Sequence, residues 1–212
     1  MWSIRFILIG ALAIMVCGGW HFLRYRSRYE GLLESRIFNI AFVIVYNCLS
    51  YLIVVLPPAG GYSARPDWLD YRSVRIGFAV MDPVLICAAI VLFIITLQQR
   101  KVIGAQDVKE GLITSGAYRY FRHPIYAGII WVCLGLALVV RNPDGLLALP
   151  AIFVINLAQA IIEERNDIGV RFREQYQDYR KTTRMFGPIW LWSVVAVIIL
   201  LLVGFARSVE MS

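Results

Sequence analysis

The sequence predicts an all-α, polytopic integral-membrane bundle of about six transmembrane helices. Of the 212 residues, 59% are hydrophobic and the mean hydropathy is +0.67, values well outside the range of soluble domains. Six stretches without charged residues each reach about the 17–25 residues that cross a hydrocarbon core as a helix. They are continuous apolar runs, which argues against the alternating pattern of a barrel. The predicted spans are Phe6–Leu23, Ile37–Ala64, Pro83–Gln99, Pro124–Val140, Gly145–Ile162 and Pro188–Ala206.

The basic excess, a net charge of +7, indicates membrane topology rather than nucleic-acid binding. When the six predicted spans alternate, fifteen of the 21 Lys and Arg residues fall on one side. By the positive-inside rule this side is cytoplasmic, and both termini lie outside. We therefore expect a multi-pass protein of the cytoplasmic membrane that contacts membrane lipids. No nucleic-acid partner and no obligate protein partner is predicted.

The cysteines do not predict a metal site. Cys17, Cys48, Cys87 and Cys133 lie one each in the first four spans. Their spacing fits neither metal ligation nor a disulfide framework, so they are interpreted as packing residues.

Asp82 and Pro83 interrupt an apolar stretch that begins near Ile76. The pair favours a helix start, with Asp82 as the N-cap and Pro83 at the first helical position. The alternative is an intramembrane carboxylate with a functional role.

The composition divides the chain into three parts. Residues 1–99 form a transmembrane scaffold of three helices. Residues 100–188 hold a polar segment, a helical hairpin and an amphipathic helix, which we expect to form the functional site at the cytoplasmic face. Residues 189–212 form the final transmembrane helix and a tail.

The hairpin follows from a short connection, RNPDG, at residues 141–145. Asn142-Pro143 and Asp144-Gly145 are turn-forming pairs, so the two flanking spans must be antiparallel neighbours. The hairpin returns the chain to the side from which it came. His123 at its entry should therefore lie close to Glu163 and Glu164 at its exit.

The segment after the two glutamates predicts an amphipathic helix. Ile168, Phe172, Tyr176 and Tyr179 form one apolar stripe on an otherwise charged helix. This helix lies either in the membrane interface, facing anionic headgroups, or as a lid on the protein.

Arginines and tyrosines at a membrane boundary commonly serve as anchors, and Arg119 and Arg122 are interpreted in this way. Three observations favour a pocket instead for the neighbouring residues. Histidine is not a preferred anchor, two adjacent carboxylates at a span end are costly, and all three belong to one hairpin.

The ordered motifs GLITSGAYRYFRHPIYAG, RNP, EE and FREQYQDYRK resemble the C-terminal signature of the isoprenylcysteine carboxyl methyltransferases. Related integral-membrane methyltransferases include phospholipid N-methyltransferases. The resemblance covers about residues 105–188. It implies methyl transfer from S-adenosylmethionine to a lipophilic small molecule or a lipidated substrate from the bilayer. A carboxylate acceptor is favoured, and a phospholipid amine or a thiol is the alternative within the same fold.

The resemblance also implies the site residues. A carboxylate acceptor needs no general base, whereas an amine or thiol would need Glu163 or His123, the two catalytic candidates. No G-x-G-x-x-G follows a strand, which excludes the soluble methyltransferase architecture. The implied cofactor-binding residues are Glu110, Gly111, Leu112, Ile113, Tyr118, His123, Pro124, Ile125, Tyr126 and Glu164.

Two features depart from the family pattern. Prenylcysteine-type members carry an arginine one helical turn before the glutamates, where this chain has Gln159 and Ala160. Either Arg165, Arg180 or Arg184 supplies that charge, or the acceptor is not a prenylcysteine carboxylate, and Arg165 and Arg184 are the candidates for substrate binding. An extra span also follows the signature. Two other functions stay open: a membrane reductase that uses NADPH, since sterol reductases share a similar signature, and a scaffold whose rim is only an anchor.

Overall fold

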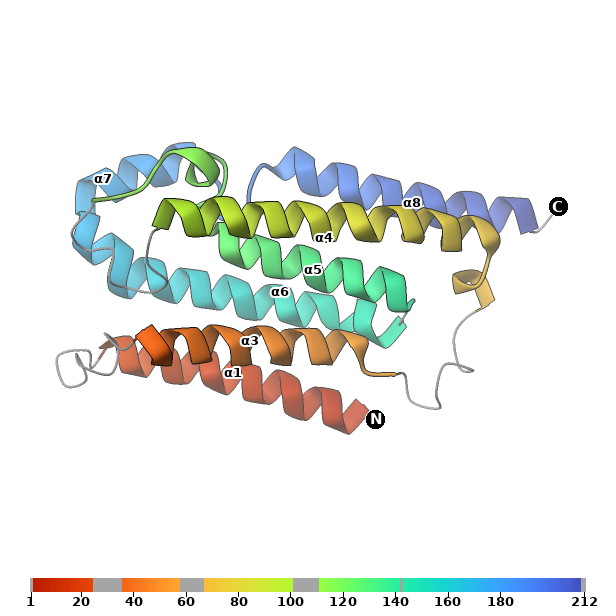
Figure 1. Ribbon diagram of the computed structural model, residues 1–212, viewed down its shortest axis with the longest axis horizontal. Coiled ribbons are helices and arrows are strands. Elements are labelled where there is room, and N and C mark those ends of the chain that lie inside the picture. The colour runs from red at the N-terminus through yellow and green to blue at the C-terminus, as the bar shows by residue number, and fades with distance from the viewer. Residues whose placement is uncertain (1, 25–35, 58–66, 101–110, 142, 211–212) are drawn as a thin grey trace.

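The computed structural model describes residues 2–24, 36–57, 67–100, 111–141 and 143–210, and every regular element among them is helical (Figure 1). The all-α prediction is therefore confirmed for this part of the chain. The long helices are α1 (Trp2–Arg24), α3 (Arg36–Val55), α4 (Arg72–Arg100), α5 (Pro124–Val140), α6 (Pro143–Glu163), α7 (Gly169–Thr182) and α8 (Ile189–Glu210). The short elements are the 3₁₀ turns η3 (Asp67–Leu69) and η5 (Gly116–Arg119) and the π-helical turn η6 (Glu164–Ile168).

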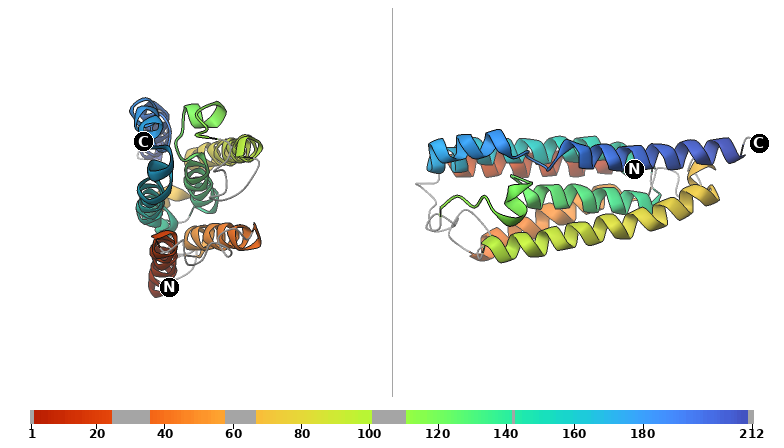
Figure 2. Two further views of the ribbon diagram at one scale, coloured as in Figure 1. Left: turned by 90° about the vertical axis from the view of Figure 1, so that its left-hand side faces the viewer. Right: turned by 90° about the horizontal axis from the view of Figure 1, so that it is seen from above.

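The hairpin of α5 and α6 lies at the centre of an elongated bundle. Helices α1 and α3 pack on one side of it, and α4 with α8 on the other (Figures 1 and 2). Helix α7 and η5 lie at one end of the bundle, and η3 with both chain ends lies at the other. Two buried residues of α5 show its central place, because Ile129 packs with α1, α3 and α6, and Trp131 packs with α4 and α8.

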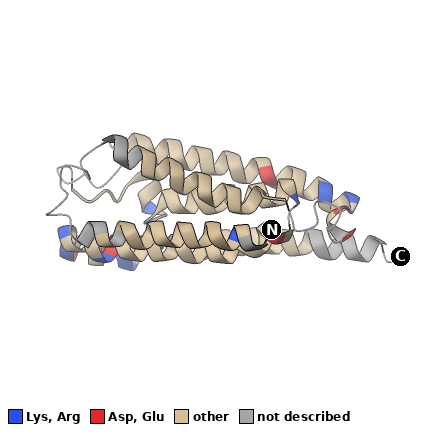
Figure 3. Ribbon diagram, turned by 90° about the horizontal axis from the view of Figure 1, so that it is seen from below, with Lys and Arg blue, Asp and Glu red and all other residues tan. Residues whose placement is uncertain are grey.

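The surface of the bundle is apolar along its length. Two helical stretches, Arg72–Gln99 and Pro143–Thr182, are long and apolar enough to cross a membrane, and four shorter apolar helices accompany them. Large side chains such as Val84, Ile90 and Leu200 are exposed. Charged residues gather mainly near the two ends of the bundle (Figure 3). An apolar belt between charged ends is the pattern of a protein in a bilayer. The count of six crossings stays a prediction.

The predicted helix start at Asp82 is wrong. Helix α4 begins at Arg72, so Asp82 and Pro83 lie inside it. The apolar residues from Ile76 continue the helix, and the proline costs it one backbone hydrogen bond. Asp82 instead packs on α5, where a Cβ atom added to Gly135 would lie 3.2 Å from its Oδ1 atom. The alternative of a carboxylate within the apolar belt fits this position.

The connection between α5 and α6 is shorter than predicted. Arg141 caps α5 in the left-handed conformation, with φ 50°, and its amide N–H reaches the carbonyls of Ala137 and Leu138. Helix α6 then begins at Pro143, so Asp144 is helical rather than part of a turn. Asn142 lies outside the described residues.

A buried ion pair joins the N-terminal helix to the hairpin. Arg5, only 1% exposed, is paired with Asp144 at the start of α6. Its Nε also donates a hydrogen bond to the Ile53 carbonyl at 3.1 Å, and its Nη2 donates to the Leu56 carbonyl. One guanidinium thus binds two backbone carbonyls at the end of α3 and the Asp144 carboxylate at the start of α6. The predicted first span begins at Phe6 and leaves Arg5 outside it, whereas the structure places Arg5 inside the bundle.

We predict that Asp144→Ala lowers the free energy of unfolding by about 3 kcal/mol, because it leaves a buried guanidinium without its counter-charge. Thermal or denaturant unfolding of the purified protein measures this. Asp70→Ala is the matched control, since its ion pair with Arg141 is exposed and contributes about 0–1 kcal/mol. Equal effects of the two substitutions would contradict the clamp role of Arg5.

Candidate functional site

A pocket lies where η5, the start of α5, η6 and α7 meet. Its interior volume is about 70 Å³. Small-molecule sites commonly measure about 300–1,000 Å³, so a nucleoside-sized ligand requires the walls to separate. The lining residues come from both halves of the predicted signature: Gly111, Leu112, Ile113, Tyr118, Arg122, His123, Glu163, Asp167, Ile168, Arg171, Phe172, Tyr176 and Tyr179.

His123 is held between two carboxylates at the wall of this pocket. Its Nε2 lies 3.1 Å from Glu164 Oε1 and its Nδ1 lies 3.5 Å from Glu163 Oε2. Consecutive helical residues point about 100° apart, so adjacent glutamates can reach both ring nitrogens of one imidazole. The Arg122 Nε atom is 3.2 Å from the same Glu164 oxygen. Arg122 and His123 thus face two carboxylates in one cluster.

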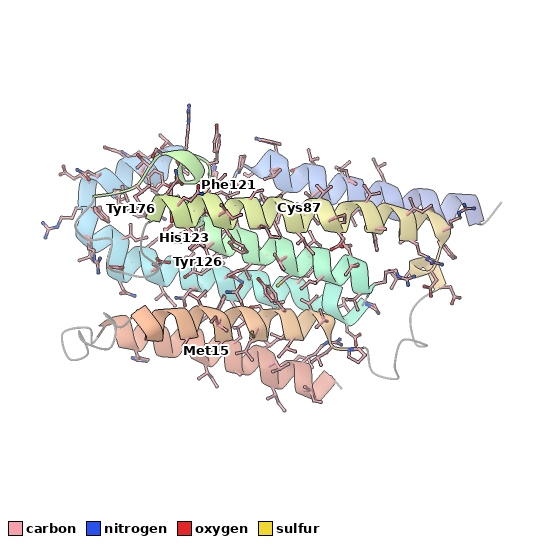
Figure 4. All side chains as sticks on the ribbon, in the orientation of Figure 1. Met15, Cys87, Phe121, His123, Tyr126 and Tyr176 are labelled. Carbon is pink, nitrogen blue, oxygen red and sulfur yellow. The ribbon has the colours of Figure 1, made fainter. Side chains whose placement is uncertain are left out.

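The position of His123 follows from the local sequence. Pro124 occupies the first turn of α5, and His123 is the non-helical residue before it, with φ −125° and ψ 70°. Its side chain makes no capping bond, which leaves the ring available to Glu163 and Glu164. Tyr126 stacks on this ring with 5.5 Å between centroids, and its hydroxyl donates to Glu163 Oε2 at 3.2 Å (Figure 4).

The backbone before α5 is tied to the chain after α7. The amide of Arg122 donates to the Arg184 carbonyl, and the amide of His123 donates to the Met185 carbonyl, both at 2.9 Å. Gly187 follows with φ +91°, and a Cβ atom there would lie 2.3 Å from Phe121. Only glycine fits both the conformation and the contact, so the GP pair before the last helix helps to fix the pocket wall.

Helix α7 covers the pocket as a lid packed on protein, the second of the two predicted alternatives. Tyr176 and Tyr179 of its stripe are buried against Tyr118. The Tyr179 hydroxyl donates to the Tyr118 carbonyl at 2.5 Å. Ile168 and Phe172, the other two stripe residues, pack against the same cluster and line the pocket.

The π-helical turn η6 connects the glutamates to this lid. The Gly169 amide donates to the Glu164 carbonyl, five residues back, instead of four as in an α-helix. A Cβ atom on Gly169 would lie 2.5 Å from that carbonyl oxygen, so the turn requires glycine. The turn also brings Asp167 to the pocket, where its carboxylate pairs with Arg171 at 2.5 Å.

The cluster shifts the pKa values of His123 and Glu164 in opposite directions. Burial lowers the pKa of His123, but hydrogen bonds and charges from Glu163 and Glu164 outweigh it, so the pKa rises above its ordinary value of 6.5. Burial raises the pKa of Glu164, but the His123 hydrogen bond and the Arg122 charge outweigh it, so that pKa falls below 4.5. The shift favours the imidazolium form of His123, the form that pairs with the two carboxylates.

The structure brings together most of the predicted site residues that it describes. Glu164 lies behind His123 as its ion-pair partner, and Tyr126 supports the cluster from α5. Pro124 is buried and Ile125 packs in the core of the bundle, both outside the pocket lining. Glu110 lies outside the described residues. The predicted residues that line the pocket are Gly111, Leu112, Ile113, Tyr118, His123 and Glu163.

The arginines differ from the sequence-based interpretation. Arg165 and Arg184 are exposed, and neither lines the pocket. Arg122, interpreted as an anchor, lines it instead, and so does Arg171. The position of Arg122 within the R-H-P motif and the four-residue spacing of Asp167 and Arg171 were the available signals for these residues.

The fold and the site together define a class of protein. In the described residues it is a helical, largely apolar bundle, typical of membrane proteins, with a tyrosine-lined pocket at one end. Residues 79–168 match the sequence profile of the phospholipid methyltransferase family. The Arabidopsis thaliana protein-S-isoprenylcysteine O-methyltransferase A is 30% identical over 79 residues, covering 37% of this chain and 40% of that relative. No solved structure matches. The resemblance to these membrane methyltransferases is thereby confirmed. The match to the profile ends at η6, before α7.

We predict a stability plateau between about pH 4.5 and 6.5. The raised pKa of His123 contributes stability that is complete below 6.5 and is lost as pH rises through the folded value. The lowered pKa of Glu164 contributes stability that is present above 4.5 and is lost as pH falls. The unfolding midpoint against pH measures both limbs. His123→Gln should remove the alkaline limb, whereas His21→Gln, at an exposed position of α1, should keep it. An unchanged alkaline limb in His123→Gln would contradict the assignment.

Proposed function

We propose that this protein is an integral-membrane methyltransferase that uses S-adenosylmethionine and acts on a lipophilic acceptor from the bilayer. The observation that carries the proposal is the pocket itself. Residues from both halves of the methyltransferase signature line it, and the segment that matches the family profile contains its paired glutamates and its histidine. The relative's name supports methyl transfer to oxygen in that protein, and the family name supports phospholipids as acceptors.

The residues of the pocket fit this cofactor chemically. Aromatic faces of Tyr118, Phe172 and Tyr176 suit an adenine ring or a sulfonium cation. Carboxylates at Glu163 and Asp167 suit ribose hydroxyls and an ammonium group. When bound, S-adenosylmethionine supplies an electrophilic methyl group on a positively charged sulfur. The carboxylates of Glu163 and Glu164 offset the positive charge of Arg122 beside such a cation.

The arginines of the pocket suit the carboxylates in the reaction. Arg122 is fixed by Glu164 and by a hydrogen bond from its Nη1 to the Arg180 carbonyl at 3.3 Å. Arg171 is fixed by Asp167. A positioned guanidinium binds a carboxylate in a bidentate manner. One of the two can hold the carboxylate of the cofactor, and the other the carboxylate of an acceptor.

Water exclusion and alignment are the contributions that this site makes to an in-line methyl transfer. Helix α7 covers the pocket at one end of the bundle, and the apolar helices α5 and α6 extend away from it. Glu163 lines the pocket and is the candidate proton acceptor of the cluster, because the raised pKa of His123 favours its protonated form. A carboxylate acceptor does not need this role, and an amine or thiol acceptor does.

We predict that the purified protein binds S-adenosylmethionine with micromolar-scale affinity and that Glu164→Ala and His123→Ala bind it at least about tenfold more weakly. Glu164→Ala removes the carboxylate that Arg122 and His123 share, and His123→Ala removes the ring held between Glu163 and Glu164. Calorimetric titration in detergent measures the affinity. Glu174→Ala, at an exposed position of α7 outside the lining, is the matched control and should bind as the wild type does. Equal binding by all variants would refute the site, and binding of NADPH in its place would favour the reductase.

We predict that label from methyl-labelled cofactor enters the lipid fraction in base-labile form, as in a methyl ester. Base treatment distinguishes this product from a methylated amine or thioether, which retains its label. For a carboxylate acceptor, Glu163→Gln should slow transfer by less than the roughly 10²–10⁴-fold contribution of a general base. Base-stable label together with a loss of that size would assign an amine or thiol acceptor and Glu163 as its base.

A further inference from the structure

A second concave surface lies between α4 and α5, at the end of the bundle away from α7. Its volume is about 600 Å³. The floor is made by Phe78 and Leu138, which are both buried, and the walls by apolar residues of the two helices. The rim carries three arginines, Arg72, Arg75 and Arg141. We refer to this surface as the arginine groove.

The arginine groove opens toward the lipid-facing side of the bundle. Ile76 and Val139, which line it, are 56% and 48% exposed, and α4 is one of the two helical stretches long enough to cross a membrane. One turn deeper along both helices, the groove is bounded by the contact between Asp82 and Gly135. It therefore extends from a charged helix end a short way into the apolar belt.

Among the described residues, the positive charge at the rim is only partly balanced by carboxylates. Arg141 pairs with Asp70 at 2.5 Å. Arg72 and Arg75 lie one helical turn apart on α4, are exposed, and have no acidic partner in the part of the chain that the structure describes. Two unpaired guanidinium groups and a third beside them form an anion-attracting rim above an apolar floor.

We propose that the arginine groove binds an anionic phospholipid, with its phosphate among Arg72, Arg75 and Arg141 and one acyl chain along Ile76, Ala79 and Val139. A guanidinium binds phosphate oxygens in a bidentate manner, and an acyl chain fills an apolar groove at a bilayer surface. The groove lies at the membrane face opposite the candidate active site, so this lipid is distinct from a substrate of the proposed transfer.

An anchor role for the arginines makes a different prediction. Anchoring arginines at a helix end interact with any headgroup phosphate and need no groove. A groove that seats one lipid selects a net negative headgroup, because a zwitterionic lipid brings a cation to the same rim. Headgroup selectivity is therefore the decisive observation.

The test uses the full-length protein, delipidated in detergent and then supplied with dioleoylphosphatidylglycerol or dioleoylphosphatidylcholine. Native mass spectrometry measures the bound lipid and thermal unfolding measures its effect. We expect at least about fivefold more retention of the anionic lipid and an unfolding midpoint about 4 °C higher than with the zwitterionic one. Arg72→Gln/Arg75→Gln should abolish both differences, and Arg72→Lys/Arg75→Lys should keep most of them.

The matched control is Arg119→Gln/Arg173→Gln, which removes the same charge at the other end of the bundle and should retain the wild-type preference. Equal retention of the two lipids by the wild type would overturn the proposal, whatever the variants do. So would a preference that survives Arg72→Gln/Arg75→Gln and disappears in the control. An equal stabilisation by glycerol 1-phosphate, which has no acyl chains, would assign the rim to a free phosphate instead of a lipid.

Discussion

The ion cluster of Arg122, His123, Glu163 and Glu164 is the interaction on which the rest of this molecule depends. It lies at the boundary of the apolar belt, where a lone charge would be costly, and each member offsets the cost of the others. Because its members come from the start of α5 and the end of α6, the cluster also fixes how the hairpin closes. The backbone bonds to residues 184–185 extend this constraint to the chain beyond α7.

The two ends of the bundle differ in how the charges of their arginines are compensated. At the pocket, Arg122 and His123 are matched by glutamates within the protein, and tyrosines line the surface beside them. At the opposite end, Arg5 and Asp144 are matched and buried, while Arg72 and Arg75 remain exposed to their surroundings. A closed charge network suits a site that must stay ordered around a ligand. An open one suits contact with lipid.

Features that depend on local sequence pattern and short connections could be predicted from the sequence. The bounds of α5 were predicted in full, since Pro124 starts the helix and Arg141 ends its apolar run, and the neighbourhood of His123 with the two glutamates followed from the hairpin. What depends on distant partners was missed. Arg5 is an interior residue because of Asp144, 139 positions away. The Asp82-Pro83 pair is typical of an N-cap. The apolar residues before it nevertheless continue the helix back to Arg72.

The π turn between the glutamates and α7 constrains the number of residues between Glu164 and Gly169. A π turn is one residue inserted into an α-helix, and each residue of an α-helix turns the chain by about 100°. Removing any residue from 165–168 would restore a regular helix and rotate the start of α7, which carries Phe172 of the pocket lining and leads to the kink at Arg173. Surface loops of proteins generally tolerate changes in length without such a consequence. An insertion or deletion between Glu164 and Gly169 in a distant relative would therefore indicate a pocket with a different arrangement of its lining residues.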